Sequence, residues 1–277
     1  MKLNKILTLT EAAVGSDIGI QRLIRTTADL HSFLDEHCSD AEWMWTEGRP
    51  IWRGFKSPLF DHNDGGIAAV IDPSATERQS QNTSNYYTLF FDNHPERAGW
   101  PKRSRSLIAS RSEHRASMFT WSSNSVYAVI PFNGVKIGAV NALDMWDTLI
   151  GVEKFHAPKH RIYRANQEVW EVLFPHVSTV RWNDWLALDQ NHEAVTKRIA
   201  EIREDFPTDP ELGNVMQHIE SEGLVNTIHA MYSNNNLVPQ HTVHTSRDLI
   251  SASADSEVWV GGPCVLIPAA AFNEFAG

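Results

Sequence analysis

The sequence predicts an α+β fold, because strand-like and helix-like stretches occupy different parts of the chain. Short runs of β-branched and aromatic residues gather in the middle and at the C-terminal end. Helical periodicity dominates the start of the chain and residues 160–231. Repeated βαβ units would alternate the two patterns, so this segregation favours α+β. The 277 residues, 42% of them hydrophobic and 21% charged, suit one folded domain, predicted here as 1–277.

The N-terminal part, residues 1–48, is predicted to be helical because apolar residues recur at helical spacing across 16–38. The stretch Ile51–Phe55 then indicates a short strand that contains an arginine. Residues 61–81 are rich in Gly, Asp, Ser and Asn and are predicted to form a loop. Periodicity does not decide whether Tyr86–Phe91 is a helix end or a strand.

The remaining core, within a predicted catalytic region 49–277, consists of further strands and one helical insertion. The strands are expected in short apolar or β-branched runs, at Ser104–Ser110, Val126–Phe132, Val135–Val140, Glu257–Val260 and Cys264–Ile267. The insertion, 160–231, is expected to contain helices at 166–174, 189–205 and 210–231, followed by a turn at 233–239.

Composition excludes several classes of function. The net charge of −10 disfavours a general nucleic-acid binder, which would usually be basic. No apolar run approaches the roughly 20 residues of a membrane helix. The two cysteines, Cys38 and Cys264, favour a reducing compartment with free thiols, and a cytoplasmic location is expected. A basic island between Arg97 and Arg115 indicates either a site for a small anion or a solvated charged loop.

Common nucleotide, zinc and hydrolase motifs do not occur in the sequence. It has no G-x-x-x-x-G-K-[ST] loop, no G-x-G-x-x-G after a strand, no H-E-x-x-H and no G-x-S-x-G. The histidines are scattered, and neither His31 with His37 and Cys38 nor His241 with His244 has a convincing metal spacing. No metal site is therefore expected.

Three separated elements contain the candidate functional residues: Trp52–Arg53–Gly54, Ser104–Arg105–Ser106–Leu107 and Asp255–Ser256–Glu257–Val258–Trp259–Val260. Each has an ordinary interpretation by itself. A lone arginine at a strand edge is usually an ion-pair partner, a serine pair before an apolar run usually starts a strand, and a glutamate at a strand mouth is usually solvated. Their order along the chain and their residue types, taken together, favour a functional interpretation.

The ordered Arg, Ser-x-Ser and Glu pattern resembles the Arg-Ser-Glu class of mono-ADP-ribosyltransferases, which includes the cholera-toxin-like enzymes and is similar to phage-encoded ADP-ribosyltransferase-like proteins. The resemblance runs loosely over residues 50 to 268. Its parts are Trp52–Gly54, Arg103–Ser106, Val126–Pro131 and Glu257–Val260. It implies a split mixed or antiparallel β-sheet core, NAD⁺ as substrate, and a host-cytoplasmic location if the chain is phage-encoded.

The resemblance implies that Arg53, with Gly54 beside it, binds NAD⁺, and that Arg103 adds a phosphate contact. A planar guanidinium can hold phosphate oxygens through two hydrogen bonds, which agrees with that role. The hydroxyls of Ser104 and Ser106 are expected to hold the ribose or a carboxylate in place.

Glu257 and Asp255 are the expected catalytic residues. Breaking the nicotinamide–ribose bond develops oxocarbenium character, which the Glu257 carboxylate could stabilise while it binds the ribose 2′-OH. Asp255 could orient or deprotonate an acceptor. The arginine-modifying members of the family carry Glu or Gln at that place, and their serine motif often has Thr where this chain has Arg105. The acceptor is therefore left open.

Three functions are compatible with these patterns. The first is transfer of ADP-ribose from NAD⁺ to a macromolecular acceptor, for which the acidic composition favours protein over nucleic acid and no membrane is expected. The second is a non-enzymatic interaction or virion-associated protein that retains the fold without turnover. The third is an NAD⁺ glycohydrolase, or another hydrolase that uses Asp255 and Glu257 as an acid/base pair.

Overall fold

The computed structural model describes residues 19–60, 65–78, 86–148, 169–170, 172–174, 181–233, 235, 241–254 and 256–276. The chain forms two compact units. Unit 1 comprises Met1–Arg78, Trp100–Asp144 and His241–Gly277, and unit 2 comprises Gln79–Gly99 and Met145–Gln240. Whether the two units act as the single domain expected over 1–277 stays a prediction.

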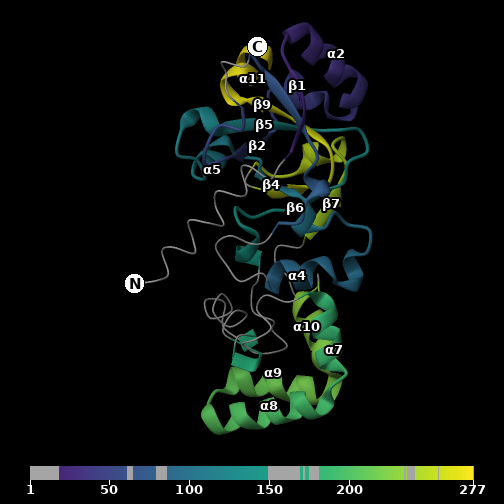
Figure 1. The fold of residues 1–277 in the computed structure, drawn as a ribbon, viewed down its shortest axis with the longest axis vertical. Helices are drawn as coiled ribbons and strands as arrows, with labels where there is room; N and C mark the ends of the chain where they lie inside the picture. Colours follow the sequence, from purple (N-terminus) through teal and green to yellow (C-terminus); the bar gives the residue numbers. More distant parts are fainter. Residues whose placement is uncertain are drawn as a thin grey trace. The chain divides into compact units, whose positions relative to one another are not determined.

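The described strands of unit 1 form one nine-stranded sheet in the order β1-β3-β9-β5-β2-β4-β8-β6-β7 (Figure 1). Every neighbouring pair is antiparallel. The strands are β1 Ile20–Ile24, β2 Ile51–Gly54, β3 Ala68–Ile71, β4 Leu107–Ser110, β5 Val126–Pro131, β6 Ile137–Val140, β7 His241–His244, β8 Glu257–Val260 and β9 Cys264–Pro268.

The centre of the sheet is buried on both faces, which explains the continuous apolar runs of its strands. All residues of β5 and β9 are buried, and the two strands pair over five registers from Tyr127↔Pro268 to Pro131↔Cys264. A strand covered on one face only would alternate polar and apolar residues, whereas a short unbroken apolar run is typical of a fully buried strand.

The helices of unit 1 are short and pack on or beside this sheet: α2 Thr27–His37, α3 Trp43–Thr46, α5 Glu113–Ser117 and α11 Ala269–Ala276. Thr26 caps α2 by accepting a hydrogen bond from the Asp29 backbone N–H at 3.1 Å, which satisfies one of its first free amides. α11 lies against β5 and β9 (Figure 1), and its Phe272 meets the Trp52 ring edge-on at 5.6 Å.

The described helices of unit 2 are α4 Tyr86–Asp92, α7 Trp182–Asp189, α8 His192–Asp205, α9 Pro210–Glu222 and α10 Leu224–Tyr232. α8 and α9 lie side by side (Figure 1), joined by the Arg203–Glu220 ion pair at 2.7 Å. The core of unit 2 is aromatic. The buried ring of Phe90 packs edge-on against the rings of Trp170, Trp185 and Tyr232, with ring centres within 5.5 Å.

The coarse prediction of helices combined with an antiparallel sheet is confirmed, and the strands expected at 51–55, 126–132, 257–260 and 264–267 are present. The undecided segment Tyr86–Phe91 is helical and belongs to α4. The ADP-ribosyltransferase-like arrangement of the core stays a prediction. No helix in the described ranges is long and apolar enough to cross a membrane.

Two segments of the N-terminal third were assigned to the wrong class. Ile20–Ile24, expected to be helical, is an edge strand that pairs with β3. Ala68–Ile71, expected to lie in a loop, is the buried strand β3 between β1 and β9. Four apolar residues in a Gly- and Asp-rich context are too few to show a period, and pairing with distant strands decides the conformation.

Three further boundaries differ from expectation. Residues 103–105 form a short 3₁₀ turn, so the strand expected from Ser104 begins at Leu107. The helix expected over 210–231 is two helices, because Gly223 adopts φ 87 between α9 and α10. In the helix expected at 166–174, residues 169–170 and 172–173 are helical, and 166–168 and 171 lie outside the described residues. Strand β7 and helix α11 were not anticipated.

Candidate active site

Arg53 lies in β2, between β5 and β4. Arg53 is paired with Tyr127 of β5, and the neighbouring Trp52 is paired with Ser110 of β4. Side chains alternate along a strand, so Arg53 projects from the face opposite to Trp52. Its guanidinium carbon lies 5.4 Å from the centre of the Phe55 ring. Strand β2 therefore presents the arginine on a face that Tyr127 and Phe55 also line.

The surroundings of Arg53 disfavour its charged form. Burial lowers the pKa of its guanidinium to about 10, the Glu257 carboxylate raises it, and the Arg103 charge lowers it further. The three groups are thus close enough to interact. The Nε atom of Arg53 is fully buried and has no hydrogen-bond partner among the described residues. A buried donor without a partner carries a free-energy cost that a bound acceptor would relieve.

Arg103 and Glu257 form a buried ion pair. The Nη1 atom of Arg103 donates to Oε1 of Glu257 at 2.5 Å, and each side chain is 10% exposed. Together with Arg53, the cluster holds two guanidiniums and one carboxylate. The structure thus pairs Arg103 directly with Glu257, and Arg53 interacts with both groups electrostatically. The register Trp52↔Ser110 and Ser110↔Glu257 places the Glu257 side chain on the face of the sheet that carries Trp52, opposite to Arg53. We call these three residues the Arg-Arg-Glu cluster.

Trp259 holds the segment that precedes Arg103 in place by packing and by a hydrogen bond to Pro101. Its fully buried ring lies across Gly138, where an added Cβ would come within 1.8 Å of the ring. The indole Nε1 donates to the Pro101 carbonyl at 3.1 Å. Gly261 allows the same proline to approach, because a Cβ there would lie 2.2 Å from the Pro101 Cβ. The segment before Arg103 is thereby held against β8, the strand that begins with Glu257.

We expect Gly138→Ala to destabilise unit 1, because the new methyl group must displace the Trp259 ring. Overpacking a well-packed core costs about 1–3 kcal/mol, and the free energy of unfolding in urea measures the loss. Gly213→Ala in α9 is the control, since no atom lies within 4 Å of the added Cβ. Alanine in a helix interior should stabilise by about 0.5–1 kcal/mol. Equal stability of the two variants would contradict the packing role of Gly138.

The predicted Ser-x-Ser element forms a turn before β4 and not part of a strand. The Ser106 hydroxyl donates to the Lys102 carbonyl at 2.6 Å and is buried. Arg78 binds the turn twice, from its backbone N–H to the Ser104 carbonyl at 2.8 Å and from Nε to the Ser106 carbonyl at 3.1 Å. The structure gives Ser106 a role in shaping the turn that contains Arg103, and Arg78 is a supporting residue that sequence patterns missed.

A second Ser-Arg-Ser, residues 110–112, begins at the residue that pairs with Glu257 in the sheet. Ser110 is buried and is the direct partner of Glu257 across β4 and β8. Its hydroxyl accepts from the Ser112 backbone N–H at 3.0 Å. Burial lowers the pKa of the intervening Arg111 to about 10, and its guanidinium carbon lies 5.0 Å from the Trp43 ring centre. The repeated tripeptide was the available signal, but only strand register singles out Ser110.

The other predicted site residues have different surroundings. Gly54 is covered by α5, since a Cβ there would lie 2.0 Å from the Ala116 carbonyl oxygen and 2.7 Å from Thr120 Cγ2. The structure therefore gives this glycine a packing role. Asp255 lies outside the described residues. Within the described ranges, no group of three or more His, Cys, Asp or Glu side chains could hold a metal ion.

Comparison of the chain with protein-family models, with curated proteins and with solved structures gave no match.

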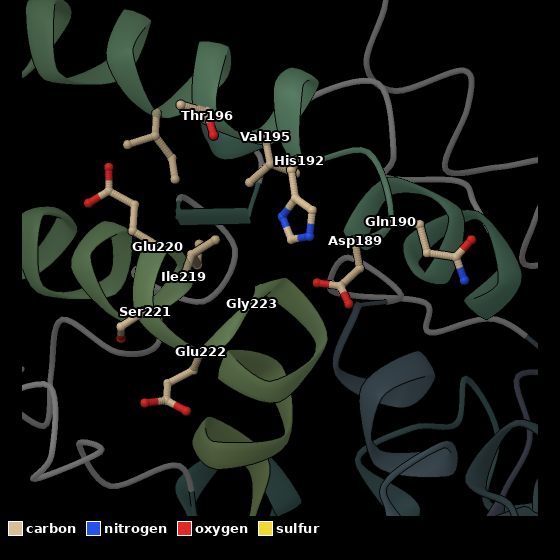
Figure 2. Close-up of a pocket in the computed structure, with 11 residues that line it drawn as sticks. Asp189, Gln190, His192, Val195, Thr196, Ile219, Glu220, Ser221, Glu222 and Gly223 are labelled. Carbon is tan, nitrogen blue, oxygen red and sulfur yellow. The ribbon is translucent and has the colours of Figure 1, made fainter.

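Unit 2 has a hollow of its own, of about 660 Å³, where α7 to α10 meet (Figure 2). Two of the acidic groups that line it, Asp189 and Glu220, are engaged within the helices. Asp189 accepts from the Leu224 backbone N–H at 2.6 Å, which caps the start of α10. Glu220 is paired with Arg203. Figure 2 shows His192 beside this hollow, on the first turn of α8. We assign no ligand to it.

Proposed function

We propose that the protein is an NAD⁺-dependent mono-ADP-ribosyltransferase, which transfers ADP-ribose from NAD⁺ to a macromolecular acceptor, protein in preference to nucleic acid. The observation that carries the proposal is the Arg-Arg-Glu cluster. It combines two positive charges, of which Arg103 is buried and Arg53 partly buried, with one carboxylate, at positions that the resemblance independently assigns to NAD⁺ binding and catalysis. Buried charges are costly unless paired, so the second guanidinium favours an anionic ligand.

In this proposal Arg53 binds the diphosphate of NAD⁺, and its unpartnered Nε supplies one of the donors. Arg103 donates to Glu257, and its remaining donors are proposed to contact the diphosphate as well. Glu257 then accepts from the ribose 2′-OH and stabilises positive charge on the ribose. Ser110, opposite Glu257 in the sheet, is a further candidate for the site.

The chemistry balances without a redox step. The bond between ribose C1′ and the nicotinamide nitrogen breaks, and its electron pair leaves with neutral nicotinamide. The oxocarbenium-like ribose is attacked by a nucleophile of the acceptor, which forms the new bond to C1′ and loses a proton. Asp255 is the proposed base for that proton, in keeping with its position two residues before Glu257.

The test is incubation of the protein with NAD⁺ labelled in its adenylate half, together with cell lysate. We expect label in the protein fraction and at least an equal amount of free nicotinamide, since hydrolysis by water adds to the release that accompanies transfer. Nicotinamide without macromolecular label would support the glycohydrolase instead. No heat of NAD⁺ binding in calorimetry, together with no nicotinamide, would support the non-enzymatic interaction protein.

A further inference from the structure

Three large apolar side chains stand exposed in four consecutive positions after α5. Met118 is 61% exposed, Phe119 45% and Trp121 79%. Single exposed apolar residues are ordinary, whereas a contiguous group of them is a feature of surfaces that bind another molecule. We call Met118, Phe119 and Trp121 the 118–121 patch.

Two cations are held on this patch. The ammonium of Lys56 lies 5.5 Å from the Trp121 ring centre, and the Arg115 guanidinium carbon lies 5.6 Å from the Phe119 ring centre. Arg115 also donates from Nη1 to the Met118 sulfur at 3.6 Å. The surface is therefore apolar and positively charged at once, although the whole chain carries a net charge of −10.

The patch is anchored to the strand that carries Arg53. Helix α5 lies so close to β2 that the Ala116 carbonyl and Thr120 fill the space beside Gly54. The hydroxyl of Thr120 donates to the Ser117 carbonyl at 2.9 Å, which stabilises the turn after the helix. A partner bound at the patch would thus be held at a fixed position relative to β2.

We infer that the 118–121 patch docks the protein acceptor through an acidic surface segment that also bears apolar side chains. The patch consists of Met, Phe and Trp, and Arg115 lies over it; these four residue types are enriched at protein–protein interfaces. The two cations select carboxylates on the partner by charge complementarity. The overall negative charge of the chain opposes long-range attraction of a nucleic acid, which favours protein. This inference rests on the proposed transferase function.

The experiment measures two rates on the same samples with adenylate-labelled NAD⁺: nicotinamide release without lysate, and label transfer to lysate protein. The double variant Phe119→Ala/Trp121→Ala should lower transfer by about tenfold or more, as expected for exposed aromatic anchors, and leave nicotinamide release unchanged. Phe206→Ala in unit 2 removes a ring of similar exposure, 46%, and should change neither rate. Thermal unfolding verifies that each variant folds.

The acidic character of the partner has its own variant. Lys56→Gln/Arg115→Gln should lower transfer, and added salt should weaken transfer by the wild type more than by this variant, because salt screens exposed charge pairs.

Four results would contradict the inference. Unchanged transfer by the double aromatic variant would exclude docking at the patch. A matching loss of nicotinamide release would place the patch in the NAD⁺ site. Label that nuclease removes and protease does not would make the partner a nucleic acid. No nicotinamide from the wild type would overturn the proposed function itself, and the docking inference with it.

Discussion

Glu257→Gln is expected to lower the rate of nicotinamide release by about 10²–10³ or more, because it removes the charge that stabilises the oxocarbenium-like ribose. The same substitution should tighten the binding of ADP, which has the diphosphate but no bond to cleave. Gln cannot hold the Arg103 guanidinium as the carboxylate does at 2.5 Å, so Arg103 becomes available to an anion. A gain of about tenfold corresponds to ~1.4 kcal/mol. Steady-state kinetics and calorimetry measure the two effects.

Glu113→Gln is the matched control, since this glutamate is exposed in the first turn of α5. It should leave both ADP affinity and nicotinamide release at the wild-type level. If Glu257→Gln weakened ADP binding, the ion pair would be part of the diphosphate site and not a competitor for it. Wild-type turnover in Glu257→Gln would remove the catalytic role.

Arg53→Met is expected to weaken NAD⁺ binding by about 10- to 100-fold, in line with the ~1.5–3 kcal/mol of a hydrogen bond to a charged group. It should also raise the thermal midpoint. The folded-state pKa of Arg53, about 10, lies below the ordinary value of 12.5, so folding disfavours its charged form. That cost is present at every pH below about 10 and is relieved only above it. Each kcal/mol recovered is worth about 2–4 °C in a protein of this size class.

Arg22→Met provides the comparison, because Arg22 also lies over an aromatic ring, that of Phe33, but is exposed in β1. Its removal should change neither NAD⁺ affinity nor the midpoint appreciably. A lower midpoint in Arg53→Met would show that the buried charge stabilises the fold. Unchanged NAD⁺ affinity would exclude Arg53 from the ligand site.

The parts of the fold that were predictable have a local signal. Val126–Pro131 and Glu257–Val260 are β-branched runs, and residues 192–205 have a clear apolar stripe, so propensity and periodicity identify them. Ile20–Ile24 and Ala68–Ile71 have no such signal. They become strands because Ile20–Ile24 pairs with Ala68–Ile71, which in turn pairs with β9, nearly two hundred positions away.

The candidate site was predictable in its residue types and not in its contacts. Arg53 and Glu257 were singled out by the order of three motifs, whereas the Arg103–Glu257 ion pair joins residues 154 positions apart and has no sequence pattern. The crossing of Trp259 over Gly138 and the pairing of Ser110 with Glu257 depend on strand register, which only the assembled sheet determines.

The most direct measurement follows the nicotinamide protons of NAD⁺ by NMR in the presence of the purified protein alone, with water as the only acceptor. We predict that free nicotinamide accumulates with the wild type, and that Glu257→Gln, at the same concentration and with its fold intact, leaves the NAD⁺ signals unchanged. Intact NAD⁺ with the wild type, both alone and after addition of lysate protein, or equal release by the two proteins, would contradict the assignment of NAD⁺ cleavage to the Arg-Arg-Glu cluster.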